Sequence, residues 1–135
     1  MKVGGATAEA PSTVRGCLGF VRALSAGDLD AATACFARDA CLITPDATAV
    51  HGRDRIRPLL AQLVARRTEI EVELSTVIGA GEVILASERW RVRSGAGEKA
   101  PRIEQVLDST LVLRRVEAEW KLAIAAPWGW GPPCP

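Results

Sequence analysis

Apolar residues recur every three or four positions in three stretches of the first half of the chain, a spacing typical of helices with one buried face. The first helix is expected to start at a cap on Ser12 or Thr13 and to end at Gly27. Asp28 caps the second helix, and the third follows Gly52. Their apolar positions are Val14, Cys17, Leu18, Val21 and Leu24; then Leu29, Ala32 and Phe36; and then Ile56, Leu59, Leu60, Leu63 and Val64.

Two local features modify this pattern. Pro58 falls within the third stretch, where an interior proline clashes with the carbonyl four residues earlier. We therefore expect this helix to start late or to have an irregular first turn. Between the second and third helices, residues 41–44 are expected to form a strand, followed by a turn at Pro45-Asp46 and an extended piece as far as His51.

From Glu69 onward the period changes to two, which is typical of strands with one buried face. The expected strands cover residues 69–78, 83–93, 103–116 and 120–126, with turns at 79–81 and 117–119 and a Gly-rich loop at 94–101. Helices followed by an antiparallel meander predict an α+β fold. We expect a single domain over residues 12–130, with a disordered tail at 1–11 and a short tail at 131–135.

Composition and charge exclude several classes of function. The 135 residues contain 17 Lys and Arg against 16 Asp and Glu, a net charge of +1, so no overall field attracts nucleic acid or an acidic membrane. The chain has no Tyr and a single histidine, which excludes a tyrosine acid and a histidine-rich metal site. Four cysteines without a CxxC pair make a zinc site improbable, and we expect neither a metal nor a cofactor.

The same features favour a cytoplasmic protein. No stretch approaches the ~18 consecutive apolar residues of a membrane-spanning helix, and the first residues lack the apolar segment of a secretory signal. Unpatterned cysteines fit reduced thiols better than a disulfide framework. A Cys17–Cys35 or a Cys35–Cys41 disulfide remains the alternative.

Several segments resemble a known family. The sequences FVRALSAGDLDAATACFARDACLITPD, AVHGRDRIRPLL, ERWRV, LVLRR and WKLAIAAPWG resemble the SnoaL-like and ketosteroid-isomerase-like branch of the nuclear transport factor 2-like (NTF2-like) superfamily. This resemblance implies a cone in which a curved antiparallel sheet carries the N-terminal helices on its concave face around a deep apolar pocket. It also implies a homodimer. Members isomerise ketosteroids, cyclise polyketides, hydrolyse epoxides or dehydrate their substrates, whereas others only bind ligands or partners, so the fold does not settle the function.

The polar groups that the isomerases use are absent from the matching positions. Phe20 stands in place of the helix tyrosine, Thr44 in place of the aspartate base, and Leu111 in place of the second oxyanion donor. In the terminal segment, Ala125 replaces the aspartate of many relatives. Proton abstraction beside a carbonyl needs a positioned base and a stabilised oxyanion, and the inherited groups for both are missing.

Strand phase indicates which polar residues face the pocket. If residues Glu69, Glu71 and Glu73 pair with Arg89, Arg91 and Arg93 on the outer face, the inner set comprises Ile84, Ala86, Glu88, Trp90 and Val92. On the next strand the phase of Leu111 adds Gln105, Leu107, Ser109 and Leu113. An inward Glu88 among apolar side chains would have a raised pKa, which suits an acid or base. A place at the wet rim, or beside an arginine, is the simpler interpretation.

Asp46 and His51 are the other candidates for acid–base chemistry. Asp46 shares a strand phase with Thr44 and could replace the lost base, although an aspartate after proline is more often a turn residue. His51 can titrate near neutral pH, or can simply pack and form hydrogen bonds before Gly52. The candidate ligand-binding residues are Phe20, Thr44, Trp90, Gln105, Ser109, Leu111 and Trp128.

Two main hypotheses follow. In the first, the protein binds a hydrophobic small molecule of polyketide, terpenoid or steroid type and transforms it by acid–base or conformational means. In the second, the protein is a partner-binding or structural module whose cone is filled. A cavity of roughly 300 Å³ or more with a carboxylate favours the first. A third hypothesis, epoxide hydrolysis, needs Glu88 and Asp108 in one pocket.

Overall fold

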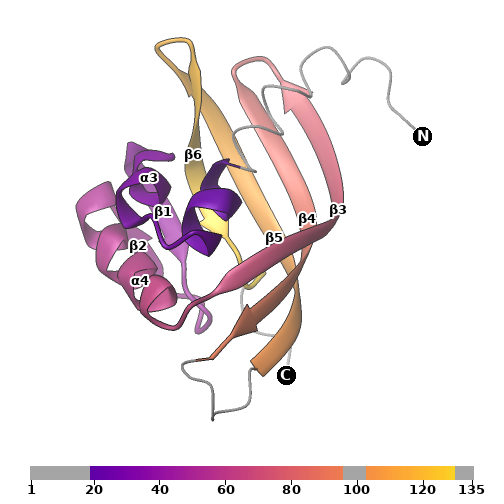
Figure 1. The fold of residues 1–135 in the computed structure, drawn as a ribbon. Coiled ribbons are helices and arrows are strands. Elements are labelled where there is room, and N and C mark those ends of the chain that lie inside the picture. The colour runs from indigo at the N-terminus through magenta and orange to yellow at the C-terminus, as the bar shows by residue number, and fades with distance from the viewer. Residues whose placement is uncertain (1–18, 96–102, 130–135) are drawn as a thin grey trace.

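The computed structural model describes residues 19–95 and 103–129. Within them, three helices lie against one face of a curved six-stranded sheet (Figure 1). The elements are a helix over residues 19–25, α3 (Leu29–Ala34), β1 (Phe36–Ile43), β2 (Ala49–His51), α4 (Arg53–Ala65), β3 (Glu69–Ala80), β4 (Val83–Ser94), β5 (Ile103–Val116) and β6 (Glu119–Ala126). The predicted α+β class is confirmed, whereas the predicted tails at 1–11 and 131–135 lie outside the described residues.

The first two helices are joined by adjacent backbone and side-chain caps. Gly27 has φ 78°, and the Asp28 N–H donates to the Ala23 carbonyl at 2.8 Å, which closes the first helix as the sequence predicts. The Asp28 carboxylate then accepts from the Ala31 N–H at 3.1 Å and caps α3. Two consecutive residues therefore end one helix and begin the next.

Two local predictions were wrong. Phe36 does not extend the second helix: α3 ends at Ala34, and β1 begins at Phe36, five residues before the strand predicted at 41–44. The third helix does not start late either, because α4 runs regularly from Arg53 with the exposed Pro58 inside it. Proline there lacks the N–H that would bond to the Asp54 carbonyl, and the packing of Ile56 and Leu60 into the core outweighs this loss.

The strand order of the sheet is β2-β1-β6-β5-β4-β3. β3, β4, β5 and β6 form the predicted antiparallel meander, and β1 pairs with β6 in parallel. A two-residue turn at Gly81-Glu82 joins β3 to β4, and Glu117-Ala118 joins β5 to β6. The meander thus reaches the helical half of the chain through its last strand.

The predicted inner face of β4 is confirmed, because Ile84, Ala86, Glu88, Trp90 and Val92 are all buried. On β5 the same phase buries Ser109, Leu111 and Leu113. These side chains meet the helices in a core whose aromatic centre is Phe20, with its ring 5.3 Å from that of Phe36 and 6.4 Å from that of Trp90. The core therefore fills much of the concave face.

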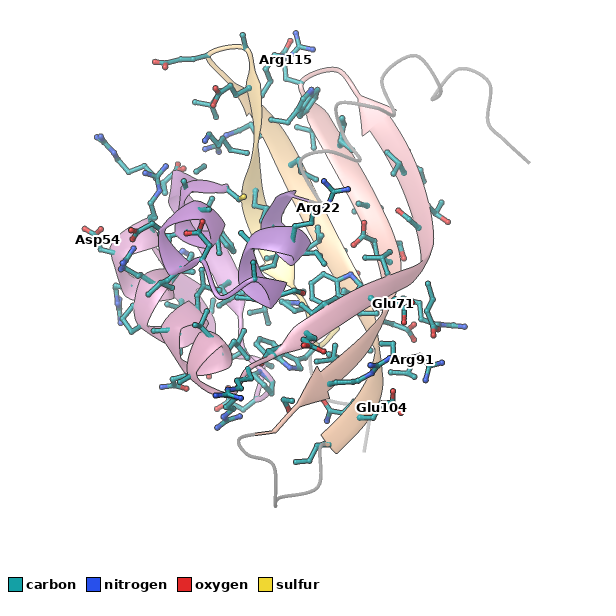
Figure 2. All side chains as sticks on the ribbon, in the orientation of Figure 1. Arg22, Asp54, Glu71, Arg91, Glu104 and Arg115 are labelled. Atoms are coloured by element: carbon teal, nitrogen blue, oxygen red, sulfur yellow. The ribbon has the colours of Figure 1, made fainter. Side chains whose placement is uncertain are left out.

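The outer face of the meander carries the predicted acidic and basic stripes. Arg91 Nε donates to Glu73 at 2.6 Å, and its Nη1 lies 3.7 Å from Glu104. Figure 2 shows Glu71, Arg91 and Glu104 gathered on the side of the sheet turned away from the helices. These pairs are exposed, so solvent and salt screen them and each contributes little to stability. No helix in residues 19–95 and 103–129 is long and apolar enough to cross a bilayer.

Candidate functional site

A small apolar cavity lies between the helices and the inner face of the sheet. Its volume is about 30 Å³, and aromatic side chains from three elements or their flanks line it: Phe20, Trp90 and Trp128. Leu63 of α4 and Leu107 of β5 add aliphatic walls. A cavity of this size holds one or two water molecules, so the cone is nearly filled in this structure.

An open groove of about 530 Å³ adjoins this cavity. Thr44 and Asp46 border it from the turn after β1, Arg66 from the end of α4, and Trp128 from the segment after β6. Leu63 and Trp128 line both the groove and the cavity. These two side chains therefore form the wall between a small apolar chamber and a larger polar-rimmed opening.

Thr68 is a polar member of the otherwise largely apolar cavity lining. The residue is 3% exposed, and its Oγ1 has no hydrogen-bond partner. Its backbone is fixed by the end of α4, where the Thr68 N–H donates to the Leu63 carbonyl at 3.1 Å and the Arg67 N–H to the Val64 carbonyl at 2.9 Å. Arg67 has φ 54°, so this is the Schellman arrangement with arginine at the position usually held by glycine.

Glu88 faces inward, as predicted, but its oxygens are already occupied. Oε1 accepts from the Trp90 indole N–H at 2.7 Å, and Oε2 accepts from the Ser75 hydroxyl at 3.3 Å. The residue is 5% exposed and lines neither the cavity nor the groove. In this arrangement the carboxylate fixes the orientation of Trp90, which is one of the cavity walls.

Asp46 lies in an exposed turn beside the groove. Its carboxylate accepts hydrogen bonds from the Thr44 hydroxyl and from the Thr48 N–H. The Thr44 hydrogen bond, with that of Thr48 after it, lowers the pKa of Asp46 below its ordinary value. Asp46 is therefore the turn residue that the simpler interpretation described, and its carboxylate is a weaker base than a free aspartate.

The remaining predicted site residues lie apart from the cavity and the groove. His51 and Gln105 are exposed, and Leu111 is fully buried behind the cavity lining. Ser109 is also buried, and its hydroxyl donates to the Pro127 carbonyl at 2.6 Å. Ser109 thus anchors the segment that carries Trp128.

The pairing required for epoxide hydrolysis is absent. Asp108 is on the outer face of β5, where its carboxylate accepts from Arg89 at 3.2 Å, whereas Glu88 points into the core. Positions on opposite faces of a sheet cannot enter one pocket. The carboxylate pair that the third hypothesis needs is therefore not formed, as the opposite strand phase of Asp108 and Leu111 indicates.

The structure assembles only part of the predicted set. Phe20, Trp90 and Trp128 line the cavity, and Thr44, Asp46 and Trp128 line the groove. Sequence reasoning missed the cavity-lining Thr68, although it shares the even-numbered phase of Ile70 and would have been found by extending that strand phase two residues back. It also did not identify Leu63 as a residue that lines both the cavity and the groove, because helical spacing predicts burial but not which spaces a side chain borders.

Two observations concern the potential metal ligands and the thiols. Among residues 19–95 and 103–129, no three His, Cys, Asp or Glu side chains gather in a group able to hold a metal ion. The Cys35 and Cys41 thiols are free, so these two residues do not form the alternative disulfide. Cys17 lies outside the described residues.

Comparisons with known proteins agree with this fold. Among solved structures, a proposed dehydratase of the NTF2-like family from Streptomyces avermitilis matches with a TM-score of 0.81 and 16% identity over 89% of this chain and 95% of that chain. A proposed scytalone dehydratase from Novosphingobium aromaticivorans matches with a TM-score of 0.76 and 14% identity over 89% of this chain and 83% of that one. A Mycobacterium tuberculosis protein of unknown function matches with a TM-score of 0.79 and 15% identity over 93% of this chain and 74% of that chain.

These identities show a shared fold alone. A search of curated proteins found no match. Residues 18–120, most of the chain, match the family described as the SnoaL-like domain. The curved sheet, the helices on its inner face and this match together show that the chain belongs to the SnoaL-like domain family.

Proposed function

We propose that the protein binds a small hydrophobic molecule with one end in the small apolar cavity and the rest in the open groove. The observation that carries this proposal is the wall that the two spaces share, Leu63 and Trp128. We infer that a rotation of either side chain would join about 30 Å³ of apolar space to about 530 Å³ of accessible groove. The combined space suits a ligand of polyketide, terpenoid or steroid type.

Binding is favoured over acid–base turnover by the positions of the candidate catalytic groups. Asp46 alone of the three borders the groove, and hydrogen bonds hold it in a turn. Glu88 is engaged by Trp90 and Ser75, and His51 is exposed outside the described cavities. General acid–base chemistry needs a group within reach of the substrate proton, so the arrangement supports a ligand-binding protein with aromatic walls.

The binding test uses the native tryptophans as reporters. We expect polycyclic ketones, terpenoids and steroids, titrated as a panel, to change the fluorescence of Trp90 and Trp128 in a saturable way. Leu63→Phe enlarges a wall residue and should weaken the affinity of a bound panel member at least about tenfold, the equivalent of ~1.4 kcal/mol. Arg55→Phe, on the exposed side of the same helix, is the matched control and should leave the affinity unchanged.

The second candidate function is a partner-binding module with a filled cone. It is favoured by one observation, the apolar cavity's volume of about 30 Å³, which is well below the roughly 300 Å³ typical of ligand pockets. Saturable binding of a panel member that Leu63→Phe weakens would exclude this candidate. Absence of binding by the whole panel would contradict the ligand-binding proposal and favour the module.

We further propose that two copies pack through the outer face of the sheet. Register places Ile78, Leu85, Val112 and Ile124 in one apolar row across β3, β4, β5 and β6. Ile78 is 60% exposed and Leu85 39% exposed. The flanking arginines and carboxylates carry both signs, so a two-fold related copy can match positive to negative groups.

Free thiols on Cys35 and Cys41 fit a reducing compartment, which supports a cytoplasmic location.

A further inference from the structure

We propose that the ligand carries a neutral oxygen on an apolar ring and that the Thr68 hydroxyl recognises this oxygen inside the cavity. The inference rests on the proposed function and narrows its ligand class. It makes Thr68 a specificity-determining residue: the apolar walls bind the ring, and the hydroxyl selects a ring with a carbonyl or hydroxyl group directed inward.

The first support is that the Thr68 hydroxyl is buried without a partner. Thr68 is 3% exposed and lines the cavity, yet its Oγ1 forms no hydrogen bond. Thr33, also buried, shows the ordinary solution, because its hydroxyl donates to the Leu29 carbonyl at 2.7 Å. A buried polar atom without a partner is costly, so a group absent from the free protein is a natural partner for Thr68.

The second support is that the hydroxyl is held in place before any ligand arrives. Both hydrogen bonds of the Schellman arrangement fix the backbone leading into Thr68. A β-branched side chain has few rotamers, so its hydroxyl direction varies little. The Leu63 carbonyl that accepts from the Thr68 N–H belongs to the wall residue shared by the cavity and the groove. The end of α4 therefore positions both Thr68, which is proposed to recognise the ligand oxygen, and Leu63, which lines both spaces.

The character of the cavity restricts the partner to a neutral group. A water molecule needs two to four polar partners, but the lining residues are predominantly apolar. The Trp90 indole N–H is already bonded to Glu88, and the Pro127 carbonyl already accepts from Ser109. A carboxylate would be desolvated without a counter-charge, because Arg66 borders the groove rather than the cavity. A ketone or alcohol oxygen attached to an apolar ring needs fewer polar partners than a water molecule and carries no charge to be desolvated.

The test compares two probes with the same ring system, 1-indanone and indane. We expect the wild-type protein to bind 1-indanone about two- to tenfold more tightly than indane, the range for one net hydrogen bond. Thr68→Val replaces the hydroxyl with a methyl group of similar shape and should abolish this preference by reducing affinity for 1-indanone. Thr68→Ser keeps the hydroxyl and should retain the preference.

A second measurement requires no ligand. Thr68→Val should raise the Tm of the free protein by several degrees, because it removes an unpartnered buried hydroxyl. Thr33→Val, the matched control, should not raise it, because that hydroxyl is bonded. A fall in Tm for Thr68→Val would mean that the hydroxyl has a structural partner, and it would overturn the inference.

The binding outcomes separate the inference from the function on which it rests. Equal affinity of the wild type for the two probes, or a preference that survives in Thr68→Val, would overturn the role of Thr68 while leaving ligand binding intact. The same conclusion holds if neither probe binds but a member of the polycyclic panel does. If nothing binds, the proposed function and this inference both fail.

Discussion

The Trp90 indole donates a hydrogen bond to Glu88 at 2.7 Å, between two residues on the inner face of β4. The sequence nominated Glu88 as an acid or base, yet the carboxylate acts on a neighbouring side chain that lines the cavity. Because the ring of Trp90 also contacts that of Phe20 at 6.4 Å, the hydrogen bond helps to shape two of the three aromatic walls. A buried carboxylate is here part of the cavity's framework.

Replacement of Glu88 should therefore affect stability according to whether an acceptor remains. Glu88→Gln retains an oxygen that can accept from the Trp90 indole, and we expect it to cost less than Glu88→Leu. The leucine variant leaves a buried N–H unpaired, which costs about 1–3 kcal/mol. Urea unfolding followed by tryptophan fluorescence measures both. Equal losses for the two variants would show that the hydrogen bond to Trp90 contributes nothing.

The lowered pKa of Asp46 should depend on Thr44. Thr44→Val removes the hydroxyl that is the main cause of the shift, so the Asp46 pKa should rise toward its ordinary value. Because the folded pKa is lowered, the stability contributed by this carboxylate is present above the ordinary pKa and is lost as the pH falls through the folded pKa. Carboxyl ¹³C chemical shifts recorded against pH measure the change directly.

Asp39 provides the internal control for that titration. Its pKa is also lowered, but by the hydrogen bond from Arg114 at 2.6 Å on another part of the surface. Thr44→Val should leave the Asp39 titration where it is. An Asp46 titration that does not move in Thr44→Val would contradict the assignment of the hydroxyl as the main cause.

A charge in the apolar row of the outer face should dissociate the proposed dimer. Leu85 lies between Ile78 and Val112 in the register of the sheet, so Leu85→Glu places a carboxylate near the middle of the row. We expect sedimentation equilibrium to give twice the chain mass for the wild type and the chain mass for this variant. Arg55→Glu, on α4, should remain dimeric. A wild-type protein that sediments as a monomer at high concentration would refute the proposed interface.

The turn between β5 and β6 should accept glycine with a gain in stability. Glu117 has φ 51° and Ala118 has φ 71°, so both central residues are left-handed, as in a type I′ turn. A non-glycine residue pays about 1–2 kcal/mol for this conformation, and part of the gain is offset by the greater freedom of glycine in the unfolded chain. Ala118→Gly should therefore stabilise the protein by up to about 1 kcal/mol in thermal unfolding.

Ala123→Gly, inside β6, tests the same residue type where the backbone is extended. Glycine in a strand interior is unfavourable by roughly 0.5–1 kcal/mol, so this variant should unfold at a lower temperature than the wild type. If both glycine variants changed stability in the same direction, the left-handed conformation of Ala118 would not be the cause.

The period-two pattern predicted the sheet well because alternation directly reports which side of a strand is buried. It placed Glu88 and Trp90 inside and the arginines of β4 outside, as observed. The helical spacing misplaced Phe36. The segment from Leu29 to Phe36 is too short for its spacing to distinguish a continuing helix from a strand that begins at Phe36. The parallel pairing of β1 with β6 joins residues about eighty positions apart, and such a contact leaves no local periodicity.

The candidate site was less predictable than the fold. The family resemblance selected Phe20 and strand phase selected Trp90, but whether a polar group lines a cavity depends on packing among elements. The end of α4 positions Thr68, and the carboxylate of Glu88 accepts a hydrogen bond from Trp90, two residues away. Strand phase could have placed Thr68 on the inner face, whereas the unpartnered state of its hydroxyl and the hydrogen bond to Glu88 depend on how the side chains pack.

The central place of β6 in the sheet also governs the order of assembly. β6 follows every other described strand in sequence, yet it lies between β1 and β5 and is the strand that unites the helical half with the meander. During synthesis, the helical half and the meander can pack into one sheet only after β6 has left the ribosome. Trp128 follows β6 by two residues. The lining of the apolar cavity is therefore completed only after β6 has paired with both β1 and β5.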